Sequence, residues 1–309
     1  MNTNNKQKIS LIIPTLNAEP MIEQLILSLK KQSLYPFEII IIDSSSDDKT
    51  VELAKKNDST VYIIKRSEFN HGKTRGLAAT LAKGNILVFL TQDVIVENNN
   101  SIEKLLKCFD GSNNIACVYG RQISKNNAPQ IEMYSRLINY PPQSMIKSKD
   151  SIKFIGIKAA FCSNSFSAYR KDMLTKVGNF PKNIIFGEDM YIAAKLILSN
   201  YKIAYIANAV VYHSHNYSLI QHFKRNFDIG VFHVREQWIE DSFGLASRTG
   251  IIYCISLFKY IGYKRPFGLV KAFLVIFVRL IGHNLGKKER FIPMFLKRKL
   301  GLSQTYWSK

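Results

Sequence analysis

The sequence predicts an α/β protein with a mostly parallel sheet flanked by helices, and three observations lead to this fold class. Short runs rich in β-branched residues alternate with helical patterns over residues 9–93. Each run is apolar throughout, as expected for strands that are covered on both faces. Polar residues follow every run, and ligands bind at the carboxyl ends of strands in such sheets. With 309 residues, 46% of them hydrophobic, the chain is long enough for one large domain.

Four strands are expected in the first third of the chain. They are ISLIIPT (9–15), FEIIIID (37–43), TVYIIK (60–65) and NILVFLT (85–91). The helical patterns between them are MIEQLILSLKKQ (21–32), KTVELAKKN (49–57) and KTRGLAATLAKG (73–84). Fourfold alternation of strand and helix predicts parallel pairing through right-handed crossovers. The four carboxyl ends would then lie together at one edge of the sheet.

Polar side chains follow each of these strands and predict a binding site at that edge. The segments are PTLN (14–17), DSSSDD (43–48), EFNHGKTR (68–75) and TQD (91–93). The third begins a helix, where unpaired N–H groups and the helix dipole favour an anion. For this loop alone, the alternative is an Asn70 cap with solvated neighbours.

The middle of the chain is less regular. We expect a strand that leads into a helix at about Tyr169, and an amphipathic helix over 187–200 with Glu188 and Asp189 in its first turn. Residues 201–215 indicate two short strands that end in a histidine pair. From Ser218 onward, apolar residues recur at helical spacing as far as Trp238.

The motifs exclude the two common glycine-rich nucleotide-binding fingerprints and favour a nucleotide site that uses a metal. Neither GxGxxG after the first strand nor GxxxxGK[ST] is present. The formal net charge of +20, from 43 Lys and Arg against 23 Asp and Glu, predicts an anionic partner. Carboxylates that face a basic loop suit a nucleotide held through a divalent metal, with one carboxylate left for proton transfer.

Cysteine usage and the N-terminus indicate a cytoplasmic protein. The four cysteines are far apart and form no CxxC pair, so buried reduced thiols are expected instead of a zinc site or disulfides. The polar segment MNTNNKQK runs directly into the first strand without the apolar stretch of a secretory signal.

The chain resembles the family 2 inverting glycosyltransferases of the Rossmann-like GT-A fold, and within them the bacterial rhamnosyltransferases. IIPTLN (12–17), IIDSSSDDKT (41–50), FLTQD (89–93) and GED (187–189) carry the resemblance to the wider family. FNHGKTR (69–75), VVYHSHNYS (210–218) and KRNFDIGVFH (224–233) are typical of the rhamnosyltransferase branch. One departure is Gly76, where the family usually has Asn.

The resemblance implies a donor site whose residues come from the four strand ends. Asp43 would accept the imide N–H of uracil or thymine, and capping of the next turn is its alternative role. His71, Lys73 and Arg75 would face the sugar and diphosphate of the donor. The expected donor residues are Pro14, Thr15, Asn17, Asp43, Asn70, His71, Lys73, Arg75, Gln92 and Asp93.

The resemblance also implies a metal site and a general base. Asp93 would bind Mg²⁺ or Mn²⁺, with His213 as a further ligand; an exposed loop pair or a zinc half-site is the alternative for His213 and His215. Alternating strand geometry sends these two histidines to the same side. Asp189 would be the base, and Glu188 and Arg225 would line the acceptor part of the site. The alternative role for Glu188 is that of a first-turn carboxylate that only stabilises the helix dipole.

The expected reaction transfers a deoxyhexose with inversion from a nucleotide donor, dTDP-L-rhamnose, to a polyprenyl-diphosphate-linked glycan in O-antigen or capsule synthesis. A family 2 enzyme that uses a UDP-hexose is the alternative donor hypothesis. A basic nucleic-acid-binding protein and a non-catalytic membrane-surface protein are hypotheses from other classes. The chain shows no nucleic-acid module, and TQD and GED are intact, so no nucleic-acid partner is expected.

The sequence divides into a catalytic domain, 1–217, and a C-terminal helical, membrane-associating region, 218–309. From Lys224 onward there are 16 Lys or Arg against five Asp or Glu. Cations interrupt the apolar segment 251–282, and its longest uncharged run is shorter than the 20 or so residues that span a bilayer. Such segments fit helices that lie on an anionic membrane surface, here the inner face of the plasma membrane. Helices packed on the catalytic domain with a solvated basic face are the alternative.

Overall fold

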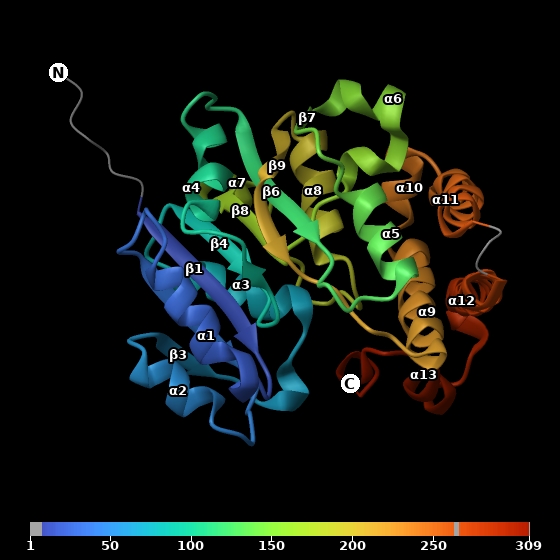
Figure 1. Cartoon of the computed structure of the whole chain (residues 1–309), viewed down its shortest axis with the longest axis horizontal. Helices are drawn as coiled ribbons and strands as arrows, with labels where there is room; N and C mark the ends of the chain where they lie inside the picture. Colours follow the sequence, from blue (N-terminus) through green and yellow to red (C-terminus); the bar gives the residue numbers. More distant parts are fainter. Residues whose placement is uncertain (1–7, 263–265, 309) are drawn as a thin grey trace.

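The computed structural model describes residues 8–262 and 266–308, and of 246–251 and 266 the backbone alone. The chain forms a mixed sheet flanked by helices, with a helical C-terminal region (Figure 1). The strands are β1 Ile9–Thr15, β2 Glu38–Asp43, β3 Thr60–Ile63, β4 Ile86–Leu90, β5 Ile95–Val96, β6 Ile115–Ile123, β7 Met145–Lys147, β8 Phe166–Arg170 and β9 Lys202–Tyr212. The α-helices are α1 Glu19–Lys30, α2 Thr50–Lys56, α3 His71–Leu81, α4 Ser101–Leu106, α5 Gln130–Asn139, α6 Ile152–Ile155, α7 Lys171–Lys176, α8 Glu188–Leu198, α9 Leu219–Arg235, α10 Gln237–Phe243, α11 Ala246–Ile261, α12 Pro266–Lys287 and α13 Met294–Leu300.

The nine strands of the described sheet follow the order β3-β2-β1-β4-β8-β6-β9-β5, and β7 pairs with β9. Strands β1, β2, β3 and β4 pair in parallel, and β6 pairs in parallel with β9. Strand β8 lies between β4 and β6 and is antiparallel to both, so β4, β6 and β9 point the same way. The prediction of a mostly parallel sheet is therefore confirmed for strand direction. The antiparallel strands β5, β7 and β8 were not expected.

Side chains alternate between two apolar layers, one on each face of the sheet. Leu11 and Ile13 of β1 pack with α1 and α4, whereas Ile12 packs on the opposite face with α3 and α8. Both layers are buried, which explains why the strands are apolar throughout. A third, smaller cluster joins α5 to α11 and α12.

The four N-terminal strands lie within two residues of their expected ends, but β9 differs from the expectation. Residues 202–212 form one continuous strand where two short strands were expected. Its pairing with β6 shifts register between Gly120 and Arg121, where β9 advances from Ile206 to Val210. The polar Asn208 lies in this irregularity, and the sequence pattern made it resemble a break. Gly120 is required there, because a Cβ would lie 2.3 Å from the Phe166 ring.

The C-terminal region is packed onto the catalytic domain through α9. Helices α9 and α12 approach so closely that a Cβ on Gly286 would lie 2.1 Å from the carbonyl oxygen of Phe227. Gly230 and Gly282 meet the partner backbone at similar distances, 2.2 and 2.4 Å. Figure 1 shows α11 and α12 beyond α9, at the end of the molecule away from β1. Three glycines thus fix the position of α12.

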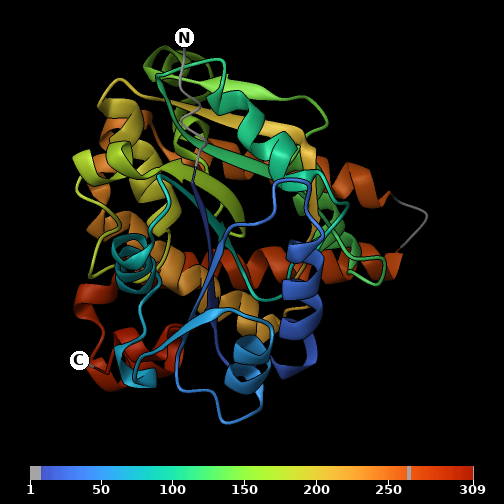
Figure 2. The ribbon, with the colours of Figure 1, turned by 90° about the vertical axis from the view of Figure 1, so that its left-hand side faces the viewer.

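The last residues return to the catalytic domain. Asp228 of α9 accepts hydrogen bonds from the backbone N–H groups of Leu302 and Ser303. The following turn, η6 Gln304–Tyr306, lies against η1 Arg66–Glu68, and both views place the C-terminus near that segment (Figure 2). Trp307 is buried. Region 218–309 therefore contributes to the same edge of the sheet as the strand ends.

Helix α12 changes one expectation about membranes. It continues through Lys271 and Arg279, and within the described residues Phe267–Lys287 is long and apolar enough to cross a bilayer by length and composition, with a mean hydropathy of 1.6. From the length of its uncharged runs, no segment of the sequence was expected to be long enough to span a bilayer. Large apolar side chains are exposed along α11 and α12: Ile252, Ile255, Phe267, Val270, Phe273, Leu274, Phe277, Leu280, Ile281 and Leu285.

Candidate active site

Two connected cavities lie at the carboxyl edge of the sheet. The larger, about 630 Å³, is lined by residues that follow β4, β6 and β9 and by the starts of α8 and α9. The smaller, about 190 Å³, lies where β1, β2 and β4 end. His71, Arg75 and Thr91 line both cavities. The shared direction of the strands thus produces the single site that the sequence predicted.

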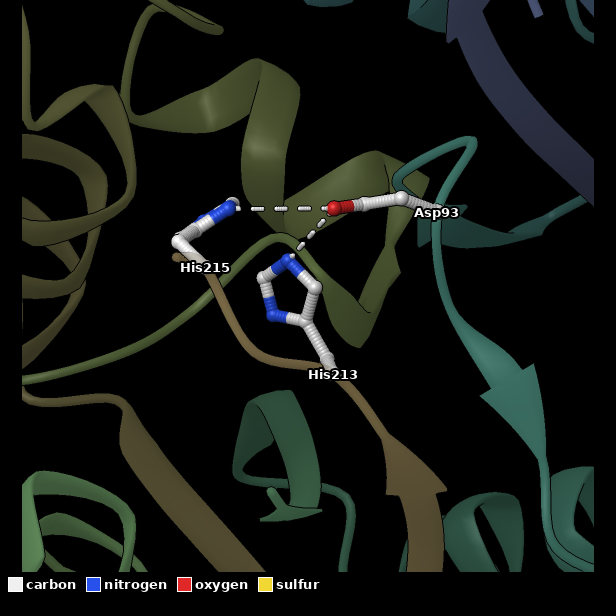
Figure 3. A group of neighbouring side chains, drawn as sticks. All are labelled: Asp93, His213 and His215. Atoms are coloured by element: carbon white, nitrogen blue, oxygen red, sulfur yellow. Dashed lines mark ion pairs between the residues drawn. The ribbon is translucent and has the colours of Figure 1, made fainter. Parts of the chain in front are cut away.

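A candidate metal site is formed by Asp93, His213 and His215 (Figure 3). The Oδ2 atom of Asp93 lies 3.2 Å from Nε2 of His213 and 3.9 Å from Nδ1 of His215. Asp93 follows β4 and His213 follows β9, and both strands end at the same edge. Although burial raises the pKa of the Asp93 carboxyl, the nearby imidazoles of His213 and His215 hold that pKa well below its usual range. The carboxylate is therefore ionised.

Gln122 and Arg136 orient the His213 ring. Oε1 of Gln122 accepts from Nδ1 of His213 at 2.8 Å and from Arg136 at 2.8 Å. Its Nε2 donates to Ser163 Oγ, so the amide orientation is set from both ends. Glu132 pairs with Arg136 at 2.7 Å. Because Nδ1 of His213 donates to Gln122, the Nε2 lone pair of the neutral ring is the atom available to a cation beside Asp93.

The three residues fit a divalent cation. Nε2 of His213 is buried and has no hydrogen-bond partner, which is unusual for a buried polar atom. The three ligand atoms lie within 4.8 Å of one another. Two ligands about 2.1 Å from one ion are roughly 3–4 Å apart, so the spacing suits a shared cation. Asp93 is the one carboxylate of the cluster, and His213 and His215 supply its other two ligand atoms.

Asp189 lies in the first turn of α8 and lines the larger cavity. Gly187 begins this helix with a φ of 73°, a conformation that favours glycine. The Asp189 carboxylate accepts from the backbone N–H groups of Met190 and Asn164. Burial, and then the nearby charge of Glu188, raise the pKa of Asp189 to about 7. This is the range in which a carboxylate can act as a general base at neutral pH.

Glu188 forms a buried ion pair with Arg75 of α3, 3.1 Å long, with side chains 6% and 5% exposed. Although burial raises the pKa of Glu188, the Arg75 guanidinium holds it below the usual value. Nδ2 of Asn164 donates to the same carboxylate at 3.1 Å. Glu188 was expected to line the site, and it does line the larger cavity while its ion pair fixes α8 against α3. Arg75 likewise has its charge paired on the protein.

The smaller cavity brings together part of the expected donor set. Pro14, Thr15, His71, Arg75 and Gln92 all line it. Oε1 and Nε2 of Gln92 bond the backbone N–H and carbonyl of Leu16, which joins the ends of β4 and β1.

His71 is neutral, because burial lowers its pKa to about 4. Arg75 lies 3.4 Å from Nδ1 of His71 and can only donate, so the ring proton is on Nε2.

Four expected donor residues line neither cavity, and three of them make hydrogen bonds within the protein. Asp43 is fully buried and accepts from Thr15 and Ser46, as its capping alternative requires, and its contact with the base stays a prediction. Asn17 accepts from the N–H of Asp47 and joins two loops. Asn70 caps α3 by accepting from the N–H groups of Gly72 and Lys73. Lys73 is exposed and lines neither cavity.

Gly76 also lies outside both cavities, and its Cβ position faces Phe180. The departure from the family pattern therefore falls away from the site.

Arg225 of α9 lines the larger cavity as expected. Its guanidinium lies 4.4 Å from the centre of the Phe186 ring and 5.8 Å from that of Tyr217. Among the described residues, no carboxylate lies within ion-pair distance of Arg225, so its charge is available to an anionic ligand.

Asn164, Gln122 and Arg136 were not predicted to belong to the site. Asn164 contacts both Glu188 and Asp189, and its Oδ1 accepts from Ser167 and Tyr169. Its position follows from the antiparallel β8, whose start lies at the carboxyl edge. The sequence CSNSFS carries no signal for this role.

A cavity beside an Asp–His cluster, at the carboxyl edge of a sheet with this topology, is typical of transferases of the GT-A class. The chain belongs to glycosyl transferase family 2, whose model matches residues 10–178. The recognised resemblance is thus confirmed.

The chain is 40% identical to two Salmonella proteins. They are the O-antigen chain rhamnosyltransferase WbaN of Salmonella anatum and RfbN of Salmonella typhimurium, and the matches cover 97% of this chain and 95–96% of each relative.

Solved structures support the fold. A mannosyltransferase from Pyrobaculum calidifontis, in complex with GDP-Man and Mn²⁺, aligns with a TM-score of 0.59 at 15% identity, over 99% of this chain and 86% of that one. TarS from Staphylococcus aureus, residues 1–349 with UDP-GlcNAc, aligns with a TM-score of 0.53 at 17% identity, over 91% and 92%.

We predict that replacing either of two ligands weakens cation binding. Asp93→Asn and His213→Ala should each weaken Mn²⁺ binding by at least about tenfold, measured by electron paramagnetic resonance. Gln122→Ala should weaken it by roughly tenfold, because the His213 ring loses its fixed orientation.

His283→Gln is the matched control, since His283 lies in α12 outside the cluster. Unchanged Mn²⁺ affinity in Asp93→Asn would show that the cluster does not hold the ion.

Proposed function

We propose that the protein transfers L-rhamnose from dTDP-L-rhamnose, with inversion, to a polyprenyl-diphosphate-linked glycan in O-antigen or capsule synthesis. The 40% identity to two O-antigen chain rhamnosyltransferases over nearly the whole chain is the observation that supports the sugar and the pathway. The site supports the reaction type, because it combines an Asp–His cluster, a carboxylate with a raised pKa and a cavity at the strand ends.

In this proposal Asp189 removes the proton from the acceptor hydroxyl as that oxygen bonds to the anomeric carbon. The bond between that carbon and the diphosphate breaks on the opposite face, which gives inversion. Asn164 holds the Asp189 carboxylate through its backbone N–H. Glu188 is paired with Arg75, which lowers its pKa, whereas the pKa of Asp189 is raised. Of the two neighbouring carboxylates, Asp189 is therefore the one suited to accept the proton.

The donor diphosphate would lie between the Asp–His cluster and Arg225. Asp93, His213 and His215 would hold a divalent cation, which supplies positive charge to the departing diphosphate when bound. Two imidazole ligands favour Mn²⁺ over Mg²⁺, since Mg²⁺ prefers oxygen ligands. Arg225 adds a cation from α9. The nucleoside would occupy the smaller cavity beside Pro14 and Thr15.

We also propose that the enzyme works on the inner face of the plasma membrane, attached through α11 to α13. These helices expose large apolar side chains, with Phe267 91% exposed. Lys259, Lys271 and Lys288 are exposed among them. Close packing of α12 on α9 through three glycines favours a helix that stays with the catalytic domain over one that crosses the bilayer. A surface position also matches an acceptor whose sugars lie at the membrane.

A panel of nucleotide sugars tests the donor. We expect dTDP-L-rhamnose to be used in preference to UDP-hexoses, with a polyprenyl-linked acceptor and Mn²⁺ present. The measurement is transfer or slow donor hydrolysis, compared at equal donor concentrations. A clear preference for a UDP-hexose would overturn the rhamnosyl assignment and favour the alternative donor.

The pH profile tests the base. Transfer should rise with pH through about 7, because Asp189 accepts a proton only when ionised and its pKa is raised. Asp189→Asn should lower kcat by about 10²-fold or more while nucleoside diphosphate binding survives.

The same variant should not lose thermal stability. A carboxyl with a raised folded-state pKa lowers the free energy of unfolding as pH rises from about 4 to 7, and the amide removes that penalty. Loss of nucleotide binding in Asp189→Asn would instead assign Asp189 to the donor.

Vesicle sedimentation tests the membrane surface. The protein should sediment with anionic vesicles, and high salt should release part of it, since each cation near the surface contributes about 1 kcal/mol and is screened. Phe273→Asp with Phe277→Asp should reduce binding, as both rings are exposed on α12. The matched control is Leu137→Asp, because Leu137 is exposed on α5. Equal binding to neutral vesicles at all salt concentrations would contradict the electrostatic contribution.

A further inference from the structure

A separate groove runs from the surface of α12 into the catalytic cleft. It has a volume of about 530 Å³ and lies between α12, the start of α9 and the segment before α5. Glu132, His215, Tyr217 and His222 line both the groove and the larger cavity of the active site. The groove therefore opens directly beside the Asp–His cluster.

One end of the groove is cationic. Lys271 lines it, and Arg279 lies where the cleft begins. Arg279 contacts only uncharged partners, the Tyr253 hydroxyl at 3.5 Å and Nδ1 of His222 at 3.3 Å. Across the part of the chain that is described, no carboxylate lies within ion-pair distance of Lys271 or Arg279. The one acidic side chain that lines the groove, Glu132, is paired with Arg136.

His222 reports the strength of this positive field. Burial, and then Arg279, Arg225 and Lys271 in that order, lower the pKa of His222 to about 4. A neutral histidine beside two unpaired cations leaves the positive charge uncompensated. Such a cluster is suited to an anion with more than one charge.

Three apolar residues of α12 lead the groove toward the surface that we propose to face the membrane. Phe267, Val270 and Leu274 line it and are exposed. They lie on the same helix as the exposed Phe273 and Phe277, which do not line the groove. A ligand in the groove would thus have its apolar part toward the proposed membrane surface and its anionic part toward the cleft.

We propose that this groove binds the isoprenyl diphosphate part of the acceptor, with Lys271 and Arg279 on the diphosphate and Phe267, Val270 and Leu274 along the first isoprene units. The inference rests on the proposed function, since it names the binding site of the acceptor in that reaction. A charged, polar end beside the catalytic cleft and an apolar end at the surface match this class of molecule in both chemistry and direction.

Direct binding of a soluble analogue tests the groove without any transfer. The probe is geranylgeranyl diphosphate, added to the full-length protein in a mild detergent and followed by tryptophan fluorescence or calorimetry. It should bind at least tenfold more tightly than geranylgeraniol or inorganic diphosphate alone, because each lacks one half of the contacts. Lys271→Ala and Val270→Asp should each weaken binding by about tenfold.

Two controls match these variants in charge and position. Lys259→Ala removes an exposed cation on α11, and Phe273→Asp places a charge on α12 outside the groove. Both should bind the probe as the wild type does. Nucleoside diphosphate binding, measured in parallel, shows that each variant is folded.

Three outcomes would overturn the proposal. They are equal loss of probe binding in the controls, equal affinity for geranylgeraniol, and full displacement of the probe by phosphatidylglycerol, which would assign the cations to a lipid headgroup. Failure of the donor panel with intact probe binding would instead reject the rhamnosyl assignment and leave the groove. In the transfer reaction, Lys271→Ala should raise KM for the lipid-linked acceptor and not for the donor.

Discussion

The direction of three strands is the constraint on which the site depends. Strands β4, β6 and β9 point the same way because β8 lies antiparallel between β4 and β6. Their carboxyl ends therefore carry Asp93, Gln122 and His213 to one edge, although these residues are as much as 120 positions apart. Since β8 runs the other way, the segment before it also reaches this edge and delivers Asn164. An all-parallel arrangement would place that segment on the far side of the sheet.

The buried pair of Arg75 and Glu188 makes this edge rigid. Both side chains are almost fully covered, so removing one partner would leave an unpaired charge, at a cost of about 3–5 kcal/mol. The pair connects α3, the helix of the donor loop, to α8, the helix that carries Asp189. Arg75 lowers the pKa of Glu188 against the effect of burial, whereas burial, and then the charge of Glu188, raise the pKa of Asp189. Arg75, which was expected to contact the donor, thus also has a structural role.

Local patterns predicted the strands, the site edge and the residues at the strand ends, because apolar runs and polar endings lie close together in sequence. Asp93, His213 and Asp189 were predicted in this way and by resemblance, and all three line the larger cavity. Asp43 and Asn70 show the limit of that reasoning, since the same residue types serve as turn and helix caps, and the sequence does not show that both accept capping hydrogen bonds. Asn164 and Gln122 could not be predicted, because the site residues that they contact, Glu188 and His213, lie 24 and 91 residues away and meet them only through the sheet.

Two parts of the surface of helix α12 differ: one packs closely on α9, and the other is apolar and exposed. Gly282 and Gly286 let its backbone come close to that of α9. Many large apolar side chains elsewhere on the helix are exposed, and they are too numerous for a surface that meets only water. The same close contact fixes Arg279 beside His222 and the cleft. A glycine-mediated helix crossing therefore produces an apolar surface and a cationic groove in one element, which is the combination that a lipid-linked anionic acceptor requires.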